Sequence, residues 1–299
     1  MSETIKTAVI EETVVKLLKF AATQLPKDVA IALKEMEANE GNTTAKANLS
    51  CIVENFTLAE HVHSPMCQDT GIVIFYVNIG EEFPKIKGLE AAIRKGTAMA
   101  TKTVPLRPNA VNPIAGGNTG DNTGRYIPFI NYDVIPGVDY LEITAFPKGG
   151  GSENMSALGM LKPGQGMKGI KQFVMETVLK AGGQPCNPVV VGVGIGGGAD
   201  IALKIAKKQL MRPIGHRHTD PAIAKLEEDL LKAVNMTGIG SMGLGGDLST
   251  AIDVKVDYAH RHPASLPVGV SIQCWAARRA TARIYPDERV EILTHEEES

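Results

Sequence analysis

The stretch S-P-M-C-Q-D-T-G, residues 64–71, places a thiol directly beside an amide and a carboxylate. A structural cysteine usually has apolar neighbours, and a nucleophilic cysteine usually has a cationic neighbour that lowers its pKa. Cys67 is instead followed by an amide and an acid, Gln68 and Asp69. A metal would account for this pattern, since it binds the thiolate and leaves the Asp69 carboxylate free to move protons. The residue types therefore point to metal-assisted acid–base chemistry.

Two further cysteines have a similar setting. Cys186 lies in G-G-Q-P-C-N-P-V-V-V, at a junction between a loop and a strand, and Cys274 ends the strand V-G-V-S-I-Q. Thiolates at the edges of strands can converge on a cavity, where they hold a metal with one position open to substrate. Cysteine thiolates also bind iron–sulfur clusters. A zinc site or a redox sensor would use the same cysteines but would not require the neighbouring amide and carboxylate.

The fourth cysteine, Cys51, has a different setting. It shares an apolar helical stripe with Ile52 and Phe56, so we expect a thiol packed in the core. The four cysteines are far apart and form no CxxC motif. In a long chain without a signal peptide, this spacing argues against a disulfide framework.

Several histidines and arginines are candidates for the same chemistry. His216 and His218 in I-G-H-R-H-T-D-P could be metal ligands, but a capping loop before a helix is the favoured interpretation. His260 and His262 alternate at a strand end, and Pro263 constrains His262. The candidate carboxylate clamps are Arg107, Arg278 and Arg279. For the last two, the simpler interpretation is a solvated pair on the surface.

A glycine-rich segment, V-V-V-G-V-G-I-G-G-G-A-D, fits the GxGxxG pattern with Gly192, Gly194 and Gly197. A dinucleotide site also needs an acidic residue about 20 positions further on, at the tip of a second strand. Asp220 has that distance but lies in a helix-start signal. We therefore expect these loop amides to stabilise nearby negative charge. An NAD-dependent oxidoreductase remains a remote alternative.

Composition and charge exclude several classes of protein. The chain has 299 residues, 43% of them hydrophobic and 21% charged, which is ordinary for a globular protein. A net charge of −2 without a basic run argues against a nucleic-acid partner. No apolar run is long enough to span a membrane. The acidic, amphipathic N-terminal segment predicts a first helix rather than a leader peptide, and hence a cytoplasmic location.

Hydrophobic spacing predicts the elements that must position these residues. Apolar residues recur every three or four positions and predict amphipathic helices over 8–24, 27–38 and 46–61. Strands and helices alternate in the remainder of the chain. We predict a mixed α/β (α+β) fold with a helical segment, 1–62, packed on an α/β body with glycine-rich loops, 63–288. Both parts belong to a single predicted domain, 1–299.

Taken together, the motifs resemble the α subunit of the class I, iron–sulfur-dependent fumarate hydratases and L-tartrate dehydratases. The resemblance runs from the first helix to about Tyr285, almost the whole chain. It rests on these segments in this order: P-M-C-Q-D-T-G, L-R-P-N-A-V, G-G-N-T-G-D-N-T-G, K-G-G-G-S-E-N, C-N-P-V-V-V-G-V-G-I-G-G, R-P-I-G-H-R-H, A-H-R-H-P and Q-C-W-A-A-R-R.

This resemblance implies a cofactor and roles for individual residues. It implies a [4Fe–4S] cluster held by Cys67, Cys186 and Cys274, with one iron acting as a Lewis acid on the substrate's hydroxyl group. It makes Asp69 and His262 the candidates for proton transfer. The implied contacts to substrate come from Gln68, Asp69, Arg107 and the glycine loop at Gly150.

The resemblance also implies a partner and a substrate. Long, single-chain members continue into a second domain, whereas this chain stops at Ser299. The expectation is therefore the two-subunit type, with an active site completed by a β subunit, an α2β2 assembly and no activity of this chain alone. The K-G-G-G-S-E-N loop is similar to the fumarase version, which favours reversible hydration of fumarate to (S)-malate. Dehydration of L-tartrate to oxaloacetate is the alternative.

Overall fold

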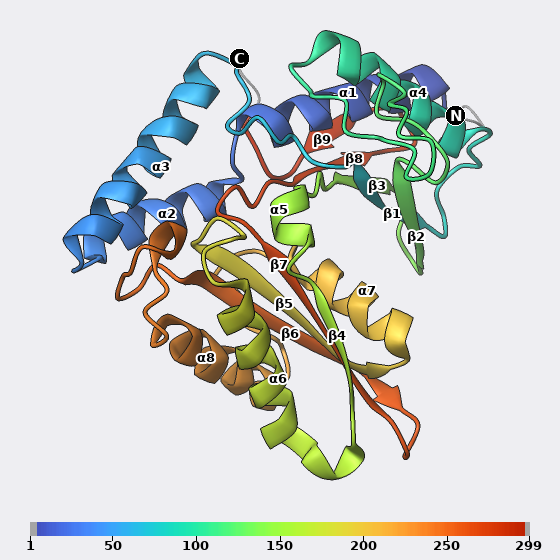
Figure 1. Ribbon diagram of the computed structural model, residues 1–299. Coiled ribbons are helices and arrows are strands. Elements are labelled where there is room, and N and C mark those ends of the chain that lie inside the picture. The colour runs from blue at the N-terminus through green and yellow to red at the C-terminus, as the bar shows by residue number, and fades with distance from the viewer. Residues whose placement is uncertain (1–4, 297–299) are drawn as a thin grey trace. The chain divides into compact units, whose positions relative to one another are not determined.

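Two β-sheets organise the chain in the computed structural model, which describes residues 5–296 (Figure 1). Each sheet belongs to one of two compact units. Unit 1 takes Asn55–Gly149 together with the two ends of the chain, up to Lys27 and from Arg278 on. Unit 2 takes Asp28–Glu54 and Gly150–Ala277. The predicted single domain 1–299 and its division after residue 62 stay predictions.

The sheet of unit 1 has the strand order β2-β1-β3-β8-β9. Its strands are β1 (Ile74–Gly80), β2 (Phe129–Ile135), β3 (Leu141–Ala145), β8 (Ala280–Ile284) and β9 (Val290–Ile292). The pair β1–β2 is parallel, and the remaining pairs are antiparallel. Alternate residues of β3 and β8 are buried, as expected for strands with one face against a core.

Two helices, α1 (Thr7–Thr23) and α4 (Leu89–Thr103), cover the core of unit 1. Buried side chains of α1, among them Val14 and Leu17, share this core with Phe75 of β1. The two helices cross closely at Gly96, where an added Cβ would lie 2.8 Å from the backbone oxygen of Glu11. A glycine is needed there because any side chain would push the helices apart.

The sheet of unit 2 has the strand order β4-β7-β5-β6. Its strands are β4 (Ala157–Leu161), β5 (Val189–Gly197), β6 (Ala251–Arg261) and β7 (Leu266–Gln273). The pair β5–β6 is parallel, whereas β7 is antiparallel to β4 and to β5. The remaining helices are α2 (Lys27–Asn39), α3 (Thr43–His61), α5 (Gly150–Glu153), α6 (Gly166–Ala181), α7 (Ala199–Gln209) and α8 (Pro221–Asn235), with 3-10 turns at Pro163–Gln165 and Ser241–Gly243.

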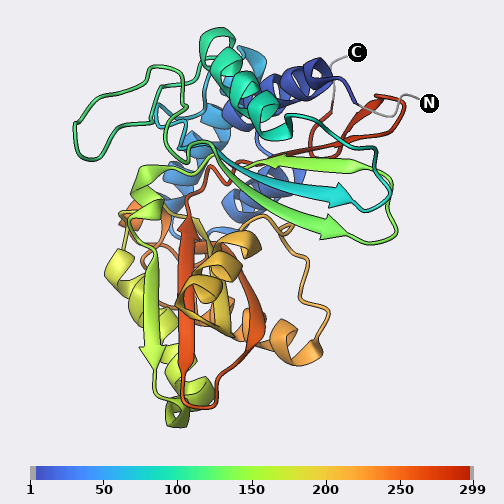
Figure 2. The same ribbon diagram turned by 90° about the vertical axis from the view of Figure 1, so that its right-hand side faces the viewer.

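Helices cover both faces of this second sheet. Val191 and Val193 of β5 join the core that α6 and α8 form on one face. Because side chains alternate along a strand, Gly192 and Gly194 point to the opposite face, where α7 lies (Figure 2). Burial on both sides explains why β5 is an almost unbroken apolar run rather than an alternating one.

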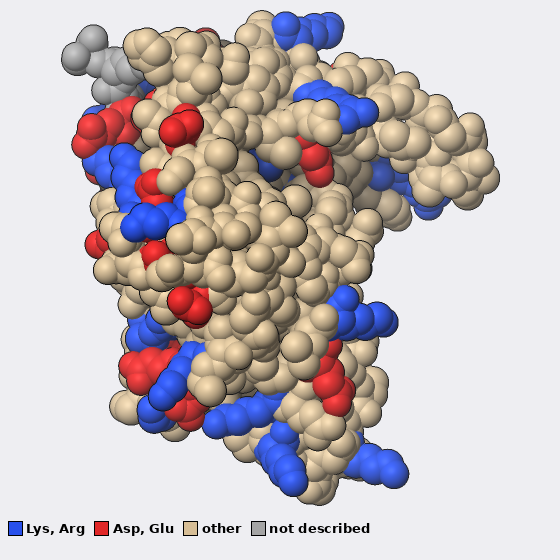
Figure 3. Space-filling view, turned by 60° about the vertical axis from the view of Figure 1, so that its left-hand side comes forward, with Lys and Arg blue, Asp and Glu red and all other residues tan. Residues whose placement is uncertain are grey.

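These elements confirm the predicted mixed α/β fold and the three predicted helices, which are α1, α2 and α3. On the face that Figure 3 shows, Lys and Arg side chains are interspersed with Asp and Glu. Within residues 5–296, no helix has the length and apolar character that crossing a membrane requires. The cytoplasmic location stays a prediction.

Candidate active-site residues

The C-Q-D-T-G segment forms a tight turn between α3 and β1 in unit 1. Cys67 and Asp69 are half-buried, and Gln68 is exposed. Asp69 Oδ1 accepts a hydrogen bond from the Gly71 amide at 2.9 Å, which closes the turn from within. The guanidinium of Arg278 donates to the Asp69 carbonyl at 2.8 Å. The turn is therefore held in a fixed conformation.

The turn is also fastened to the start of the K-G-G-G-S-E-N loop. Ile72 and Lys148 exchange two backbone hydrogen bonds of 2.9 Å. Gly71 has a φ of 85°, and a Cβ there would lie 2.7 Å from the Lys148 nitrogen, so this position requires glycine. A Cβ on Gly149 would lie 3.2 Å from Asp69 Oδ2. The Asp69 carboxylate thus lies directly against the first glycine of the loop.

Arg107 is brought to the same turn by Thr70. The buried Thr70 hydroxyl accepts a hydrogen bond from the Arg107 amide at 3.0 Å, and Asn109 Nδ2 donates to the Gly71 carbonyl at 3.0 Å. The Arg107 side chain itself is exposed. Unit 1 therefore brings together Gln68, Asp69 and Arg107. The sequence analysis did not predict that Thr70 binds the Arg107 backbone. The only signal for it in the sequence is a hydroxyl residue within the turn.

The two arginines that follow the last cysteine are not a solvated pair. Arg278 is 1% exposed and Arg279 is 4% exposed. The surface interpretation was wrong because Arg278 is needed at the Asp69 carbonyl, where its hydrogen bond holds the turn. A buried guanidinium that orients an acidic residue positions the site, which differs from the predicted clamp on a substrate carboxylate.

Cys186 and Cys274 lie together at one end of the sheet in unit 2. The Trp275 amide donates to the Cys186 carbonyl at 3.1 Å, which ties the segment after β7 to the segment before β5. Cys186 is exposed and has a φ of 61°, and Cys274 is half-buried. The backbone thus places Cys186 and Cys274 at the same end of the sheet.

The donor set suits an iron–sulfur cluster chemically. None of the four cysteines forms a disulfide bond. Cys67 belongs to unit 1, and Cys186 and Cys274 belong to unit 2. No group of three or more His, Cys, Asp or Glu side chains that could hold a metal is found within residues 5–296. Thiolates are the usual ligands of such clusters, so the three cysteines fit by residue type.

Two buried carboxamides flank the cysteines of unit 2. Asn187 follows Cys186 and is 1% exposed, and Gln273 precedes Cys274 and is fully buried. Asn187 Oδ1 and Gln273 Oε1 have no hydrogen-bond partner within the described part of the chain. A buried acceptor without a donor in the protein is a place where an outside donor, such as a water or a substrate hydroxyl, can bind. This observation also agrees with a bound group at this edge.

His262 lies at the opposite end of the same sheet. It follows β6 and is exposed, and its Nδ1 accepts from the Ala264 amide at 3.2 Å. It precedes β7, whereas Cys274 follows β7. The eight residues of β7 span about 23 Å from one end to the other. The structure therefore does not bring His262 together with Cys186 and Cys274 within one chain.

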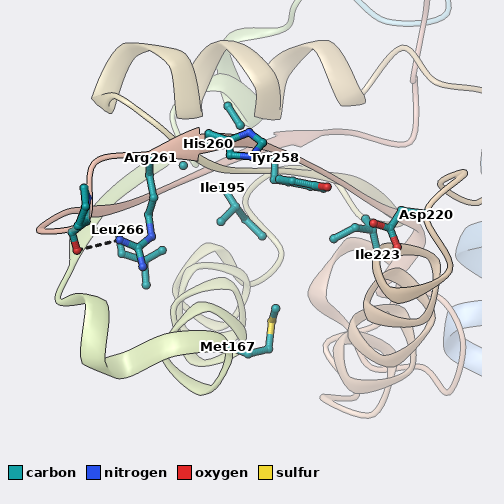
Figure 4. Close-up of a pocket in the computed structure, with 11 residues that line it drawn as sticks. Met167, Ile195, Asp220, Ile223, Tyr258, His260, Arg261 and Leu266 are labelled. Carbon is teal, nitrogen blue, oxygen red and sulfur yellow. Dashed lines mark hydrogen bonds between the residues drawn. The ribbon is translucent and has the colours of Figure 1, made fainter.

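A cavity of about 550 Å³ lies at the C-terminal ends of β5 and β6, and its lining includes Arg261 and Pro263, the chain neighbours of His262 (Figure 4). Ile195, Ile223 and Leu266 supply apolar walls, and Tyr258 and His260 lie on the β6 side. The guanidinium of Arg261 donates to backbone carbonyls of the following loop at 3.0 Å, so it supports the His262 loop.

Cys51 is exposed, and the prediction of a packed core thiol was wrong. Ile52 and Phe56, four residues apart on α3, form its buried stripe and are 4% and 3% exposed. Residue 51 lies outside this stripe, because one residue along a helix rotates the side chain by about 100°.

The loop with His216 and His218 is a capping loop, as favoured from the sequence. His218 Nδ1 accepts from the Asp220 amide at 2.9 Å, and Asp220 Oδ1 accepts from the Ala222 amide at 2.8 Å. Asp220 is therefore the N-cap of α8 rather than a ribose ligand at a strand tip. The sequence pattern that suggested NAD lacks its acidic partner.

The glycines of the GxGxxG pattern have a packing role. Gly192 and Gly194 lie inside β5, and a Cβ at either position would lie 2.1 Å from the backbone oxygen of Ala206 or Ala202 in α7. They allow the helix to lie directly on the sheet. A dinucleotide fingerprint would place its glycines in the turn after the strand.

Comparisons with known proteins identify the family. The family described as "Fumarate hydratase (Fumerase)" matches residues 11–283. A Methanocaldococcus jannaschii protein named "Putative L(+)-tartrate dehydratase subunit alpha" is 51% identical over 284 residues, which are 94% of this chain and 99% of that protein. "L(+)-tartrate dehydratase subunit alpha" of Escherichia coli (strain K12) is 36% identical over 286 residues, 96% of this chain and 94% of that protein.

The fold and the match together define a lyase of the hydro-lyase class, whose members add water to or remove it from their substrates. The chain belongs to the fumarate hydratase family, as the resemblance of its motifs predicted.

Proposed function

We propose that the chain is the α subunit of a hydro-lyase that dehydrates L(+)-tartrate to oxaloacetate. The observation that carries this proposal is the similarity over nearly the full length to proteins named L(+)-tartrate dehydratase subunit alpha. Hydration of fumarate to (S)-malate is the second candidate, which the description of the family favours. Both reactions make or break a C–O bond on a four-carbon dicarboxylate. The names of the relatives thus favour the alternative over the fumarate preference drawn from the glycine loop.

The turn of unit 1 supports roles for Gln68, Asp69 and Arg107, and the family resemblance adds a role for the backbone at Gly150, which belongs to unit 2. Arg107, with its exposed guanidinium, would bind a substrate carboxylate by two parallel hydrogen bonds. The Gln68 amide and the backbone at Gly150 would orient the substrate. Asp69 would move the proton, since its half-buried carboxylate lies beside the glycine loop and its backbone is held by Arg278.

We assign Cys67, Cys186 and Cys274 as the ligands of a [4Fe–4S] cluster on the basis of the family resemblance and of their residue type, since none of them forms a disulfide bond. When bound, the cluster would supply a Lewis-acidic iron that makes hydroxide a viable leaving group. The chain's own residues then bind the carboxylates, exclude alternative orientations and transfer the proton. Replacing any of these cysteines by serine should lower the iron and acid-labile sulfide content, a result that can be measured without substrate.

His262 can serve the same reaction only from a second copy of the chain. Its separation from Cys274 by the length of β7 is fixed, because a central sheet strand does not bend back on itself. The exposed His262 imidazole has its Nδ1 occupied by the Ala264 amide, so Nε2 is the atom that would carry the proton. An α2β2 assembly contains two α chains and so satisfies this requirement.

The β subunit is the proposed partner because both relatives are named as subunit alpha. We expect it to complete the active site, so that this chain alone is inactive. The test is anaerobic reconstitution of the chain with iron and sulfide, with and without the β subunit. Turnover of L(+)-tartrate and of (S)-malate is then measured on the same preparation.

We expect activity only in the presence of the β subunit, and a higher kcat/KM for L(+)-tartrate than for malate. A higher kcat/KM for malate would favour the second candidate. Turnover by the chain alone would contradict the subunit dependence. A reconstituted complex that dehydrates neither substrate would refute the hydro-lyase function.

A further inference from the structure

The segment after Arg107 carries an exposed apolar side chain on an uncharged loop. Residues 108–120, P-N-A-V-N-P-I-A-G-G-N-T-G, contain no charged residue. Ile114 is 96% exposed, the highest value of any large hydrophobic side chain in the part of the chain that the structure describes. Figure 2 shows the segment between α4 and β2 extending away from the rest of unit 1. A contact that unit 1 does not supply would explain an isoleucine in this position.

Hydrogen bonds within the loop hold Ile114 in place. Asn112 Oδ1 accepts from the amides of Ile114 and Ala115 at 2.9 and 3.0 Å. The Asn112 amide donates to the Gly117 carbonyl at 2.7 Å, and a bridge pairs Val111 with Asn118. The loop is therefore ordered although its tip contributes nothing to a core. Such preorganisation lowers the entropy that a contact with another molecule would cost.

The base of this loop is part of the candidate active site. Asn118 Nδ2 donates to the Pro108 carbonyl at 2.9 Å, next to Arg107. Arg107 and Asn109 are themselves bonded to the turn that carries Asp69. A partner that completes the site around Asp69 and Arg107 must approach the base of the loop. It is then within reach of the tip as well.

We propose that residues 108–120 form a docking finger for the β subunit and that Ile114 binds in an apolar pocket on that partner. This inference rests on the proposed function, because it takes the β subunit as the molecule that completes the site. The absence of charge from the finger means that apolar burial and shape, rather than ion pairing, select the partner. A single buried isoleucine at the centre of an interface contributes roughly 10- to 100-fold to affinity.

The test uses the β subunit with which the reconstituted chain is active. The Kd between this β subunit and the chain is measured by titration calorimetry. We expect Ile114→Asp to raise the Kd at least about tenfold, and Ile114→Leu to keep it near the wild-type value. Met236→Asp is the matched control, since Met236 is 76% exposed and lies at the end of α8 in unit 2. Melting temperatures of all three variants should equal that of the wild type.

A photo-crosslinking amino acid at position 114 provides an independent measurement, and it should label the β subunit. Wild-type affinity of the Ile114→Asp variant would overturn the docking finger and leave the proposed function intact. Crosslinking to a second α chain instead would overturn the choice of partner. A wild-type chain that binds no β subunit would overturn the proposed function, and this inference with it.

Discussion

Gly192 lies in the middle of β5, with the backbone of α7 directly against it. A methyl group there would lie 2.1 Å from the Ala206 carbonyl oxygen, and neither a strand nor a helix backbone can move aside cheaply. We expect Gly192→Ala to lower the free energy of unfolding by about 3 kcal/mol or more. Gly164→Ala is the control, since its Cβ would meet nothing within 4 Å. Equal stability of the two variants in urea unfolding would contradict the packing role.

Glu40 in unit 2 is a carboxylate whose pKa is lowered to about 2. Burial alone would raise this pKa, but backbone amides of Asp247, Asn42 and Leu248 and the Ser249 hydroxyl bind the charged form and outweigh burial. The lowered value means that the charge stabilises the fold fully above about pH 4.5 and that this contribution is lost as the pH falls toward 2.

We therefore expect Glu40→Gln to lower the free energy of unfolding at pH 7 by about 1–2 kcal/mol, since an amide nitrogen cannot accept from these donors. The difference from wild type should shrink below pH 4.5, where the wild-type carboxylate begins to lose its contribution. Denaturant unfolding of both proteins at several pH values measures this difference in the free energy of unfolding. A difference that stays constant down to pH 3 would show that the charge is not the cause.

At the scale of elements, buried charged side chains of β6 bind the loop at residues 216–217, which precedes α8. Asp253 and Lys255 of β6 are fully buried and lie 2.8 Å apart, and Asp253 also binds Arg217 at 2.7 Å. Burial lowers the pKa of Lys255, whereas Asp253 opposes this shift. The Lys255 ammonium further donates to the His216 carbonyl at 2.7 Å. The R-P-I-G-H-R-H motif therefore has a structural role, since it binds this loop to β6.

Asp253→Asn should destabilise the chain by about 3–5 kcal/mol, because it leaves the buried Lys255 without its counter-charge. Asp229→Asn is a suitable comparison, since Asp229 pairs with exposed lysines of the solvent face and should change stability little. Urea unfolding of both variants checks the contrast. Similar losses for both would mean that burial does not set the strength of these pairs.

Some of the helices and strands could be predicted from the sequence, and others could not. Helices α1, α2 and α3 follow from apolar residues that recur every three or four positions along each of them. Strand β2 lacks such a pattern, since it is an edge strand and is partly exposed along its length. The strand, F-I-N-Y-D-V-I, pairs with β1 through its backbone. Backbone pairing does not depend strongly on residue type, so the sequence gives little sign of it.

The candidate site divides in a similar way. Cys67, Gln68 and Asp69 are contiguous, so their shared turn could be read directly from the sequence. The burial of Arg278 could not, because it depends on a carbonyl that lies far away in the chain. The position of His262 was equally hidden: sequence distance to Cys274 is short, but an intervening strand turns that distance into spatial separation.

At the scale of the whole molecule, this separation decides how the active sites of an assembly are composed. If His262 acts on substrate bound beside Cys274, each active site contains cysteines from one α chain and the histidine from another. In a two-fold symmetric pair of α chains, both sites are then shared in the same way. Neither chain would form a complete site by itself.

Mixed assemblies test this composition. Cys274→Ser and His262→Ala chains, each with its own affinity tag, are co-expressed with the β subunit, and complexes carrying both tags are purified. Each single-variant assembly should be nearly inactive.

The mixed assembly should recover about half of the wild-type activity, because one of its two sites combines an intact Cys274 from one chain with an intact His262 from the other. A mixed assembly as inactive as its parents would instead place both residues in the same chain, which the length of β7 opposes. Near-normal turnover of the His262→Ala assembly would remove the histidine from the reaction altogether.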